Sequence, residues 1–287
     1  MTANADLSLP ARGALSIWFT RSKRFWFLGL LGQVAVATTA GVTAVTGLIS
    51  GPIAVLLGVV SVVAPVLLWR ADTLRQRADT LLRQVELEDG FGWPIDRKLL
   101  SDNLVMAIPL GEKAKARAEE QGTFYASSRD AGPARALDNL RESAWWTQHL
   151  SSSMAWITGA AAASLFILAL WGLLAGFTVA ASQDITKLSN VLVAILGLVV
   201  TTDLLRLPVE YKALSRCACE CDRLATALLR APTPTADEAF RLVADYQLNR
   251  ALAPQLPDWV WRLRRKRLNE IWNSTRSQSE DLHESAQ

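Results

Sequence analysis

Apolar residues dominate four stretches of this chain, and the stretches fall into two pairs. Met154–Phe177 contains no charged residue, and Val191–Leu207 follows it after a short polar loop. An earlier pair occupies Phe25–Ile49 and Pro52–Trp69, joined by a turn at Ser50-Gly51-Pro52. At 1.5 Å per residue, helices of these lengths cross the roughly 30 Å hydrocarbon layer of a bilayer. The pattern predicts an integral membrane protein with four transmembrane helices arranged as two hairpins.

Basic residues gather on one side of all four stretches. The two loops on the opposite side contain Lys187 as their only basic residue. Because Lys and Arg stay on the cytosolic side of membrane spans, we expect a multi-pass protein of the bacterial inner (cytoplasmic) membrane with both termini in the cytosol. The flanking residues that carry this argument are Arg12, Arg21, Lys23, Arg24, Arg70, Arg75, Arg77, Arg83, Arg135, Arg141, Arg206, Lys212, Arg216 and Arg223.

Helical periodicity continues outside the apolar stretches. Leu74, Ala78, Leu81, Leu82 and Val85 repeat at intervals of three and four, which predicts that the second span runs on as a helix into the cytosol. The glycines and proline of residues 90–94 should end that helix. Further helices are predicted at Leu99–Ile108, Ala134–Leu150, Val209–Arg230, Ala236–Leu252 and Asp258–Asn273. No strand pattern is present, so the predicted class is all-α.

These elements divide the chain into six segments. Residues 1–24 form an N-terminal lead-in, disordered to about Ala11 and then amphipathic, as either an ordinary juxtamembrane helix or a lipid-contacting one. Residues 25–69 are the first hairpin, 70–153 a cytosolic helical segment and 154–207 the second hairpin. Residues 208–273 form a second cytosolic segment, and 274–287 a disordered tail.

Composition and motifs argue against enzymatic chemistry. The net charge of +3 is too small for nucleic acid to be a main partner. Cys217 and Cys221 share a helix face while Cys219 points elsewhere, so we expect reduced thiols and no metal site. His149 has no nucleophile or acid at motif spacing, and there is no phosphate-binding loop. We expect neither a cofactor nor a catalytic residue.

A few polar residues inside the spans are candidates for function. Asp203 lies near the cytosolic end of the fourth span and can either bridge to Arg206 at i+3 or take part in gating. Thr39, Thr43 and Thr46 of the first span adjoin a stripe of small residues that includes Gly29 and Gly32. Small residues let helices approach closely in lipid, so this region is a candidate for oligomer contacts or for lining a pore.

The last predicted helix contains a charge anomaly. Arg264 and Arg267 fall on the same helical face as Val260, Leu263 and Ile271. Guanidinium groups within an apolar face need anions. Three sources remain open, namely carboxylates of a neighbouring helix, lipid phosphates and a phosphorylated ligand such as a nucleotide.

In its order of parts the chain resembles the four-transmembrane effectors of bacterial anti-phage conflict systems, which are encoded beside nucleotide second-messenger synthases. Local agreements are Thr123-Phe124-Tyr125, Glu142-Ser143-Ala144-Trp145-Trp146 and residues 244–249 with the later Leu268-Asn269-Glu270-Ile271-Trp272. The resemblance implies an effector that breaches the inner membrane when a nucleotide or protein trigger acts. It assigns no catalytic residue.

Two functional hypotheses follow. In the first, the chain is a non-enzymatic membrane-perturbing effector that forms pores as a homo-oligomer, with its cytosolic helices mediating regulation. In the second, it is a membrane scaffold or accessory subunit that recruits a cytosolic partner. Four helices of one chain cannot surround a water-filled channel, so the first hypothesis requires several copies in the lipid bilayer.

Overall fold

The structure, a computed structural model, describes residues 5–46, 51–94, 125–178, 203–231 and 233–284, together with residues 192, 197 and 199. Within these residues the chain forms six long helices and no strand, which confirms the all-α class. The predicted helix at 99–108, the loop at 179–190 and most of the predicted fourth span lie outside the described residues.

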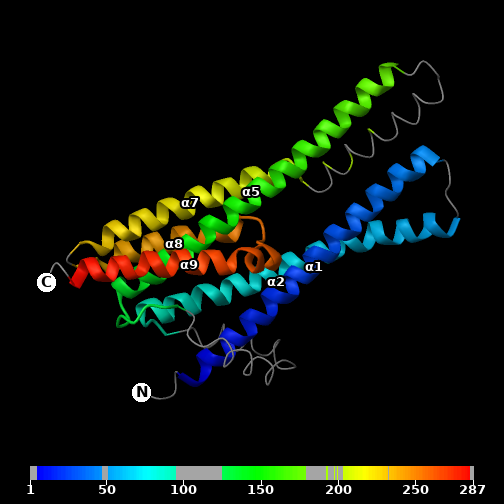
Figure 1. Cartoon of the computed structure of the whole chain (residues 1–287). Coiled ribbons are helices and arrows are strands. Elements are labelled where there is room, and N and C mark those ends of the chain that lie inside the picture. Colours follow the sequence, from blue (N-terminus) through cyan, green and yellow to red (C-terminus); the bar gives the residue numbers. More distant parts are fainter. Residues whose placement is uncertain are drawn as a thin grey trace.

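Three helices pass without interruption from polar into apolar sequence. They are α1 (Ala5–Thr46), α2 (Gly51–Phe91) and α5 (Pro133–Thr178), with 42, 41 and 46 residues. We call residues 25–46 of α1 with 52–69 of α2 the first arm, and residues 154–178 of α5 the second arm. The remaining helical residues form the bundle. Both arms extend from the same end of the bundle (Figure 1).

The N-terminal lead-in belongs to the bundle. The prediction of disorder up to Ala11 is wrong for residues 5–11, because α1 begins at Ala5 and continues through Pro10. The C-terminal half of α2 buries four residues of this segment, namely Ala11, Ala14, Leu15 and Trp18. The amphipathic face of this segment therefore packs on protein, at a spacing of three and four residues that lets one helix cover another.

Glycine allows α1 and α2 to pack closely within the first arm. A Cβ atom on Gly29 would lie 2.7 Å from Cγ of Leu68 and 3.0 Å from the carbonyl oxygen of Ala64. A Cβ atom on Gly32 would lie 3.1 Å from Cβ of Ala64. The predicted small-residue stripe is thus used, at these two positions, for contact inside the chain.

The bundle half of α2 follows the prediction closely. All five residues of its apolar repeat, from Leu74 to Val85, are buried. The helix ends where glycine was expected to end it. Gly92 has φ of 72°, in the left-handed region that glycine adopts without strain, and its N–H donates to the carbonyl oxygen of Glu88 at 2.9 Å.

Three further helices complete the bundle: α7 (Arg206–Leu229), α8 (Ala236–Leu252) and α9 (Asp258–Glu284). The predicted limits of α8 are confirmed, and Thr235 caps it by accepting from the N–H of Glu238 at 3.3 Å. The predicted end of α9 near Asn273 is wrong, because the helix continues to Glu284.

The bundle has a core shared by α2, α5, α7 and α8. Its buried members include Phe91, Leu137, Leu140, Ala218 and Tyr246. A second cluster, nearer the arms, joins α5 and α7 to α9 through Trp145, Met154, Tyr211, Val260 and Leu268. The bundle therefore holds segments that are distant in sequence in fixed positions beneath the arms.

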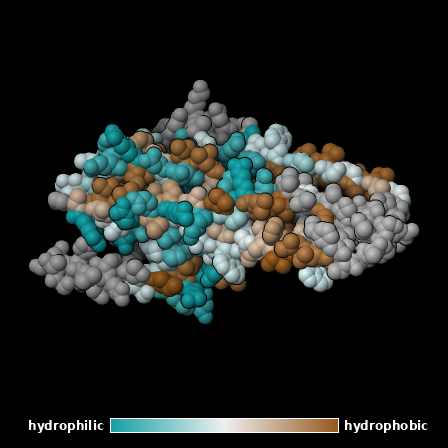
Figure 2. Space-filling view, turned by 90° about the horizontal axis from the view of Figure 1, so that it is seen from above, coloured by the Kyte–Doolittle hydropathy of each residue, from teal (hydrophilic) through white to brown (hydrophobic). Residues whose placement is uncertain are grey.

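The arms expose their apolar side chains. α2 and α5 are each long and apolar enough to cross a membrane, and only 6% and 11% of the residues in their most apolar windows are buried. A core helix of similar composition would be mostly covered. Val55, Trp156 and Phe166 are 69%, 77% and 70% exposed. Hydrophilic residues are concentrated over the bundle, at the left of the view, and are sparse toward the arms at the right (Figure 2).

Candidate functional site: polar contacts along α2

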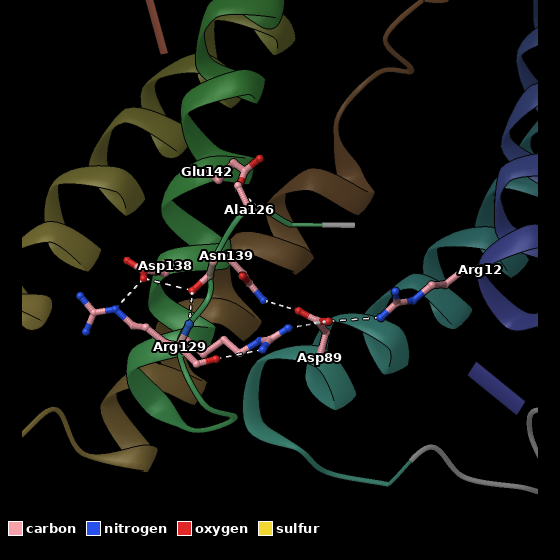
Figure 3. A network of polar contacts seen from close by, with 9 residues as sticks. Arg12, Asp89, Ala126, Arg129, Asp138, Asn139 and Glu142 are labelled. Carbon is pink, nitrogen blue, oxygen red and sulfur yellow. Dashed lines mark hydrogen bonds and ion pairs between the residues drawn. The ribbon is translucent and has the colours of Figure 1, made fainter. Parts of the chain in front are cut away.

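Polar side chains at three positions along α2, Asp89, Glu86 and Arg75, contact other parts of the bundle. We describe them as three levels, starting with the one farthest from the arms. The level farthest from the arms is centred on Asp89. Arg12 of α1 and Arg135 of α5 place Nη2 atoms 3.2 and 3.1 Å from Oδ1 of Asp89. Asn139 donates from Nδ2 to Oδ2 of Asp89 at 2.7 Å (Figure 3). One carboxylate therefore connects three helices.

A short segment before α5 folds back over the same level. The backbone N–H of Ala126 donates to Glu142 at 3.0 Å, and Arg129 Nε lies 2.7 Å from Oδ2 of Asp138 (Figure 3). Arg135 also donates to the carbonyl oxygen of Arg129 at 2.9 Å. The carboxylates of α5 thus serve to hold residues 126–129 against the helix.

The middle level is centred on Glu86. Its Oε1 accepts from the hydroxyl of Tyr125 at 2.8 Å and from Nη1 of Arg250 at 3.1 Å, and its Oε2 accepts from Gln247 at 2.8 Å. The Glu86 side chain is 9% exposed. Burial acts to lower the pKa of Arg250. The attraction of the Glu86 carboxylate, together with that of Tyr246, Tyr125 and Asp79, outweighs the effect of burial and raises the pKa. Arg250 stays charged.

Tyr246 extends this cluster toward α5. Its hydroxyl oxygen lies 2.7 Å from Oγ1 of Thr147 and 3.1 Å from Oγ of Ser143. Burial raises the pKa of Tyr246, so the hydroxyl remains a neutral donor. A small cavity beside it is lined by Glu86, Tyr125, Ala136, Asn139, Leu140, Ser143, Val243 and Tyr246.

The level nearest the arms begins with Arg75. Its guanidinium donates to the carbonyl oxygens of Arg250 at 3.0 Å and Ala251 at 3.2 Å, and also to that of Ala253. These carbonyls lie at and just beyond the C-terminal end of α8, where carbonyl groups lack partners within the helix. Asp79 accepts from Arg75 in turn, at 3.4 Å, although burial raises the pKa of this carboxyl. Arg75 therefore fixes the end of α8 to α2.

The turn between α8 and α9 is held where the arms meet the bundle. Gln255 donates from Nε2 to Oγ of Ser22 at 2.7 Å, and Ser22 donates to the carbonyl oxygen of Ala71 at 2.8 Å. The hydroxyl of Tyr211, on α7, donates to the carbonyl oxygen of Gln255 at 2.7 Å. Burial raises the pKa of Tyr211, which keeps this donor protonated.

We call Ser22, Ala71, Tyr211 and Gln255 the junction. Ser22, Tyr211 and Gln255 are 0%, 0% and 8% exposed. An ion pair between Lys23 and Asp258 lies next to it. Because α1 and α2 lead into the first arm and α7 packs on α5, the junction connects the bases of both arms through a single glutamine. Buried polar groups satisfied in this way specify one arrangement.

The polar residues predicted for the arms occupy simpler positions. Thr39 is half-buried and donates to the carbonyl oxygen of Ala35 at 2.8 Å, within its own helix. Thr43 is also half-buried, and Thr46 is the last residue of α1, with its side chain outside the described residues. None of these contacts tests the predicted roles.

Asp203 does not lie within a continuous helix as predicted. It has φ of 49° and forms a turn before α7, where its carbonyl oxygen accepts from the N–H groups of Arg206 at 2.9 Å and Leu207 at 3.1 Å. Arg206 pairs with Glu210, at 2.5 Å between Nε and Oε1. The predicted bridge at i+3 is replaced by one at i+4, because Asp203 has left the helical path.

Arg264 and Arg267 are exposed. The predicted apolar face of α9 is divided, since Val260 is 1% exposed whereas Leu263 and Ile271 are 70% and 42% exposed. Only part of the predicted apolar face is therefore buried, and neither guanidinium group forms an ion pair with a described residue. They lie on the surface of α9 next to its packed side.

The thiols have the predicted arrangement on α7, with Cys221 buried, Cys217 half-buried and Cys219 exposed. Burial raises the pKa of Cys221 to about 12 and also raises the pKa of Cys217. Within the described residues no group of three or more His, Cys, Asp or Glu side chains is placed to hold a metal ion.

Sequence reasoning missed the junction and the residues at Asp89, although a signal was present. Ser22 continues the buried series Ala11, Leu15 and Trp18 at the next helical position. Asp89 similarly continues the series that ends at Val85. A polar residue at the next position of a buried stripe indicates a buried polar contact.

Comparison of the whole chain with known proteins adds no relative. No protein family, curated protein or solved structure matches it.

Proposed function

We propose that this chain is a non-enzymatic, four-span protein of the bacterial inner membrane, with both termini and the bundle in the cytosol, which perturbs the membrane as a homo-oligomer. The observation that supports this most is the continuity of α1, α2 and α5 from a polar bundle into exposed apolar arms. Such surfaces are stable when lipid covers them. We assign the fourth span to the apolar stretch that begins at residue 191 and ends before the turn at Asp203.

The junction supports a regulated function. Movement of the α8–α9 turn would act on both arm bases at once, because Gln255 bonds Ser22 on one side and Tyr211 on the other. A trigger that binds the bundle, either a cytosolic protein or a nucleotide, could therefore change how the arms are held. The resemblance to anti-phage effectors agrees with this proposal.

Oligomerisation follows from the small size of the membrane part. Four helices have no room for a wet channel between them, and the exposed side chains of the arms are almost all apolar. A pore must therefore form between copies. Asp203, at the polar end of the second hairpin, and the threonines of α1 are the residues we assign to gating or lining.

Topology is the first test. In a chain whose native cysteines are replaced by alanine, Ser50→Cys and Gln183→Cys should react with a membrane-impermeant maleimide in intact spheroplasts. A chain that keeps Cys219 as its only cysteine should react only after the spheroplasts are permeabilised, because this exposed thiol belongs to the bundle, which we place in the cytosol. Labelling of either loop position only after permeabilisation would contradict the four-span arrangement.

Membrane perturbation is tested with purified full-length protein in vesicles that contain a fluorescent dye. We expect leakage to rise more steeply than linearly with the protein-to-lipid ratio, since several copies form each pore. Gln255→Ala, which loosens the junction, should leak at lower ratios, and Asp203→Ala should leak less. Vesicles that stay tight with every variant, although the protein is inserted, would favour the scaffold hypothesis.

One observation favours that alternative function. Phe91, Trp93 and Phe240 form an aromatic cluster at the end of the bundle away from the arms, with ring centroids 4.8 Å apart for Phe91 and Trp93 and 5.4 Å for Trp93 and Phe240. Trp93 and Phe240 are 43% and 37% exposed. Exposed aromatic clusters are common at protein interfaces. Loss of a co-purifying cytosolic protein in Trp93→Ala, with membrane potential unaffected, would support a scaffold.

A further inference from the structure

The first turns of α9 combine a dense set of cations with exposed aromatic residues. Five of the six residues from 262 to 267 are basic, and all of them are exposed. Trp259 and Trp261, just before them, are 45% and 40% exposed, and Leu263 among them is 70% exposed. We call residues 259–267 the basic turns. Their cations are Arg262, Arg264, Arg265, Lys266 and Arg267.

These cations are not neutralised by the rest of the described protein. None of the ion pairs between described residues involves them, whereas exposed arginines elsewhere, such as Arg223 and Arg241, pair with acids on their own helices. Arg265 instead lies over the ring of Trp261, with Cζ 4.6 Å from the ring centroid. Tryptophan beside arginine is the combination enriched at the surface of a bilayer.

The basic turns lie at the base of the arms. Asp258, the first residue of α9, pairs with Lys23, two positions before the apolar stretch of α1 begins at Phe25. Val260 packs in the same cluster as Met154, where the apolar stretch of α5 begins. α9 then runs along the bundle away from the arms (Figure 1). The tryptophans are therefore nearest the arms and the cations slightly farther away.

The cations lie within reach of the polar layer of a membrane. At 1.5 Å per residue, positions 262 to 267 lie about 6 to 14 Å along the axis from Asp258. The headgroup region of one leaflet is roughly 5–8 Å thick. Arginine and lysine side chains are long enough to reach back toward that layer. The cations also point in several directions around the helix, so they do not converge as a pocket for one small ligand would require.

We propose that the basic turns of α9 bind the phosphate groups of anionic phospholipids in the membrane that the arms enter. This inference rests on the membrane insertion proposed above. It assigns Arg264 and Arg267 to lipid, in preference to a neighbouring carboxylate or a soluble phosphorylated ligand. Lipid charge would then set how firmly α9, and through Asp258 the junction, is held at the membrane surface.

The test measures hydrogen exchange of the full-length protein in nanodiscs of neutral phosphatidylcholine, with and without about one third of an anionic phosphatidylglycerol. We expect amides of residues 259–272 to exchange several-fold more slowly in the anionic discs. High salt should remove that difference, because the attraction is screened. Amides of the arms should be protected equally in both discs, which reports insertion separately.

A charge variant and a matched control complete the experiment. The triple variant Arg264→Gln, Arg265→Gln and Arg267→Gln should lose the dependence on anionic lipid. The control Arg223→Gln, Arg230→Gln and Arg241→Gln removes the same number of charges from the end of the bundle away from the arms. In this control the exchange of α9 should still depend on anionic lipid.

Three results would overturn the inference. Equal exchange of α9 in both discs would show that lipid charge does not matter. Protection of α9 by inorganic pyrophosphate in neutral discs would assign the cations to a soluble ligand. Unprotected arms in both discs would refute membrane insertion itself, and the lipid site with it.

Discussion

Gln255 and Ser22 lie 233 positions apart in the sequence, yet the amide of one donates to the hydroxyl of the other at 2.7 Å inside the protein. The contact links the turn before α9 to the part of α1 that lies just before the first arm. Since Gln255 also accepts from Tyr211, its hydrogen bonds join α1, α7 and the α8–α9 turn.

The junction predicts a measurable loss of stability. Gln255→Ala leaves Ser22 without its donor and removes a buried amide, so it should lower the free energy of unfolding by about 1–3 kcal/mol. Thermal or chemical unfolding of the detergent-solubilised protein measures this. Gln76→Ala, at an exposed position on α2, is the control and should change little. If both variants unfold alike, the junction contributes nothing to stability.

Loss of the Asp89 carboxylate should lower the free energy of unfolding more than Gln255→Ala does. Asp89→Asn leaves Arg12 and Arg135 without their anion in a site where the Asp89 side chain is 10% exposed. Removing one partner of a buried ion pair costs about 3–5 kcal/mol, and the partial exposure of both arginines reduces this to about 2–4 kcal/mol. The same unfolding measurement applies. Asp72→Asn, exposed on the same helix, should stay close to the parent protein, and an equally small effect of Asp89→Asn would contradict the role of this network.

Two glycines of the first arm should respond differently to alanine. Gly29→Ala places a Cβ atom against Leu68 and the backbone of Ala64, so it should destabilise the α1–α2 pair by about 1–3 kcal/mol. Gly58→Ala meets no atom within 4 Å and should be neutral or stabilising by up to about 1 kcal/mol, because alanine favours helix. Unfolding in mixed micelles distinguishes the two, and equal effects would argue against this helix contact.

His149 should make stability depend on pH. Burial lowers the pKa of His149 below 6.5, although the nearby carboxylate of Asp222 partly opposes the shift. The unfolded chain therefore binds a proton more readily than the folded protein, and stability should fall as pH decreases from about 6.5 through the folded pKa. His149→Gln should reduce the fall in melting temperature between pH 7.5 and 5.5.

The chain contains only one other histidine, which supplies the control for that measurement. His283→Gln should retain the full decrease. If His149→Gln retains it as well, then other groups, such as Asp222 itself, account for the pH dependence.

Much of the secondary structure was predictable because it depends on local signals. The repeat from Leu74 to Val85 identified the buried face of α2, and the glycines of residues 90–94 identified its end. The predicted limits of α8 also match the structure. The ends of α1 and α9 were not predictable in this way. Pro10 and the polar tail both suggested disorder, but in the structure the helices continue past them.

The candidate site was less predictable because periodicity shows which face is buried and not what covers it. The predicted helices leave Gln255 between Leu252 and Asp258, but no local feature of Gln255 indicates that Ser22 would be its partner. Arg264 shows the converse. Its place on the helical face of Val260 and Leu263 indicated a nearby anion, but no ion pair between the described residues supplies one.

The unbroken course of α2 has a mechanical consequence. Its 41 residues form a rod about 60 Å long that continues from the bundle through Pro65 into the first arm. If the rod pivots near Ala71, a tilt of about 10° moves each end by about 5 Å, in opposite directions. A modest displacement at the bundle end of α2 is thereby transmitted to the tip of the first arm.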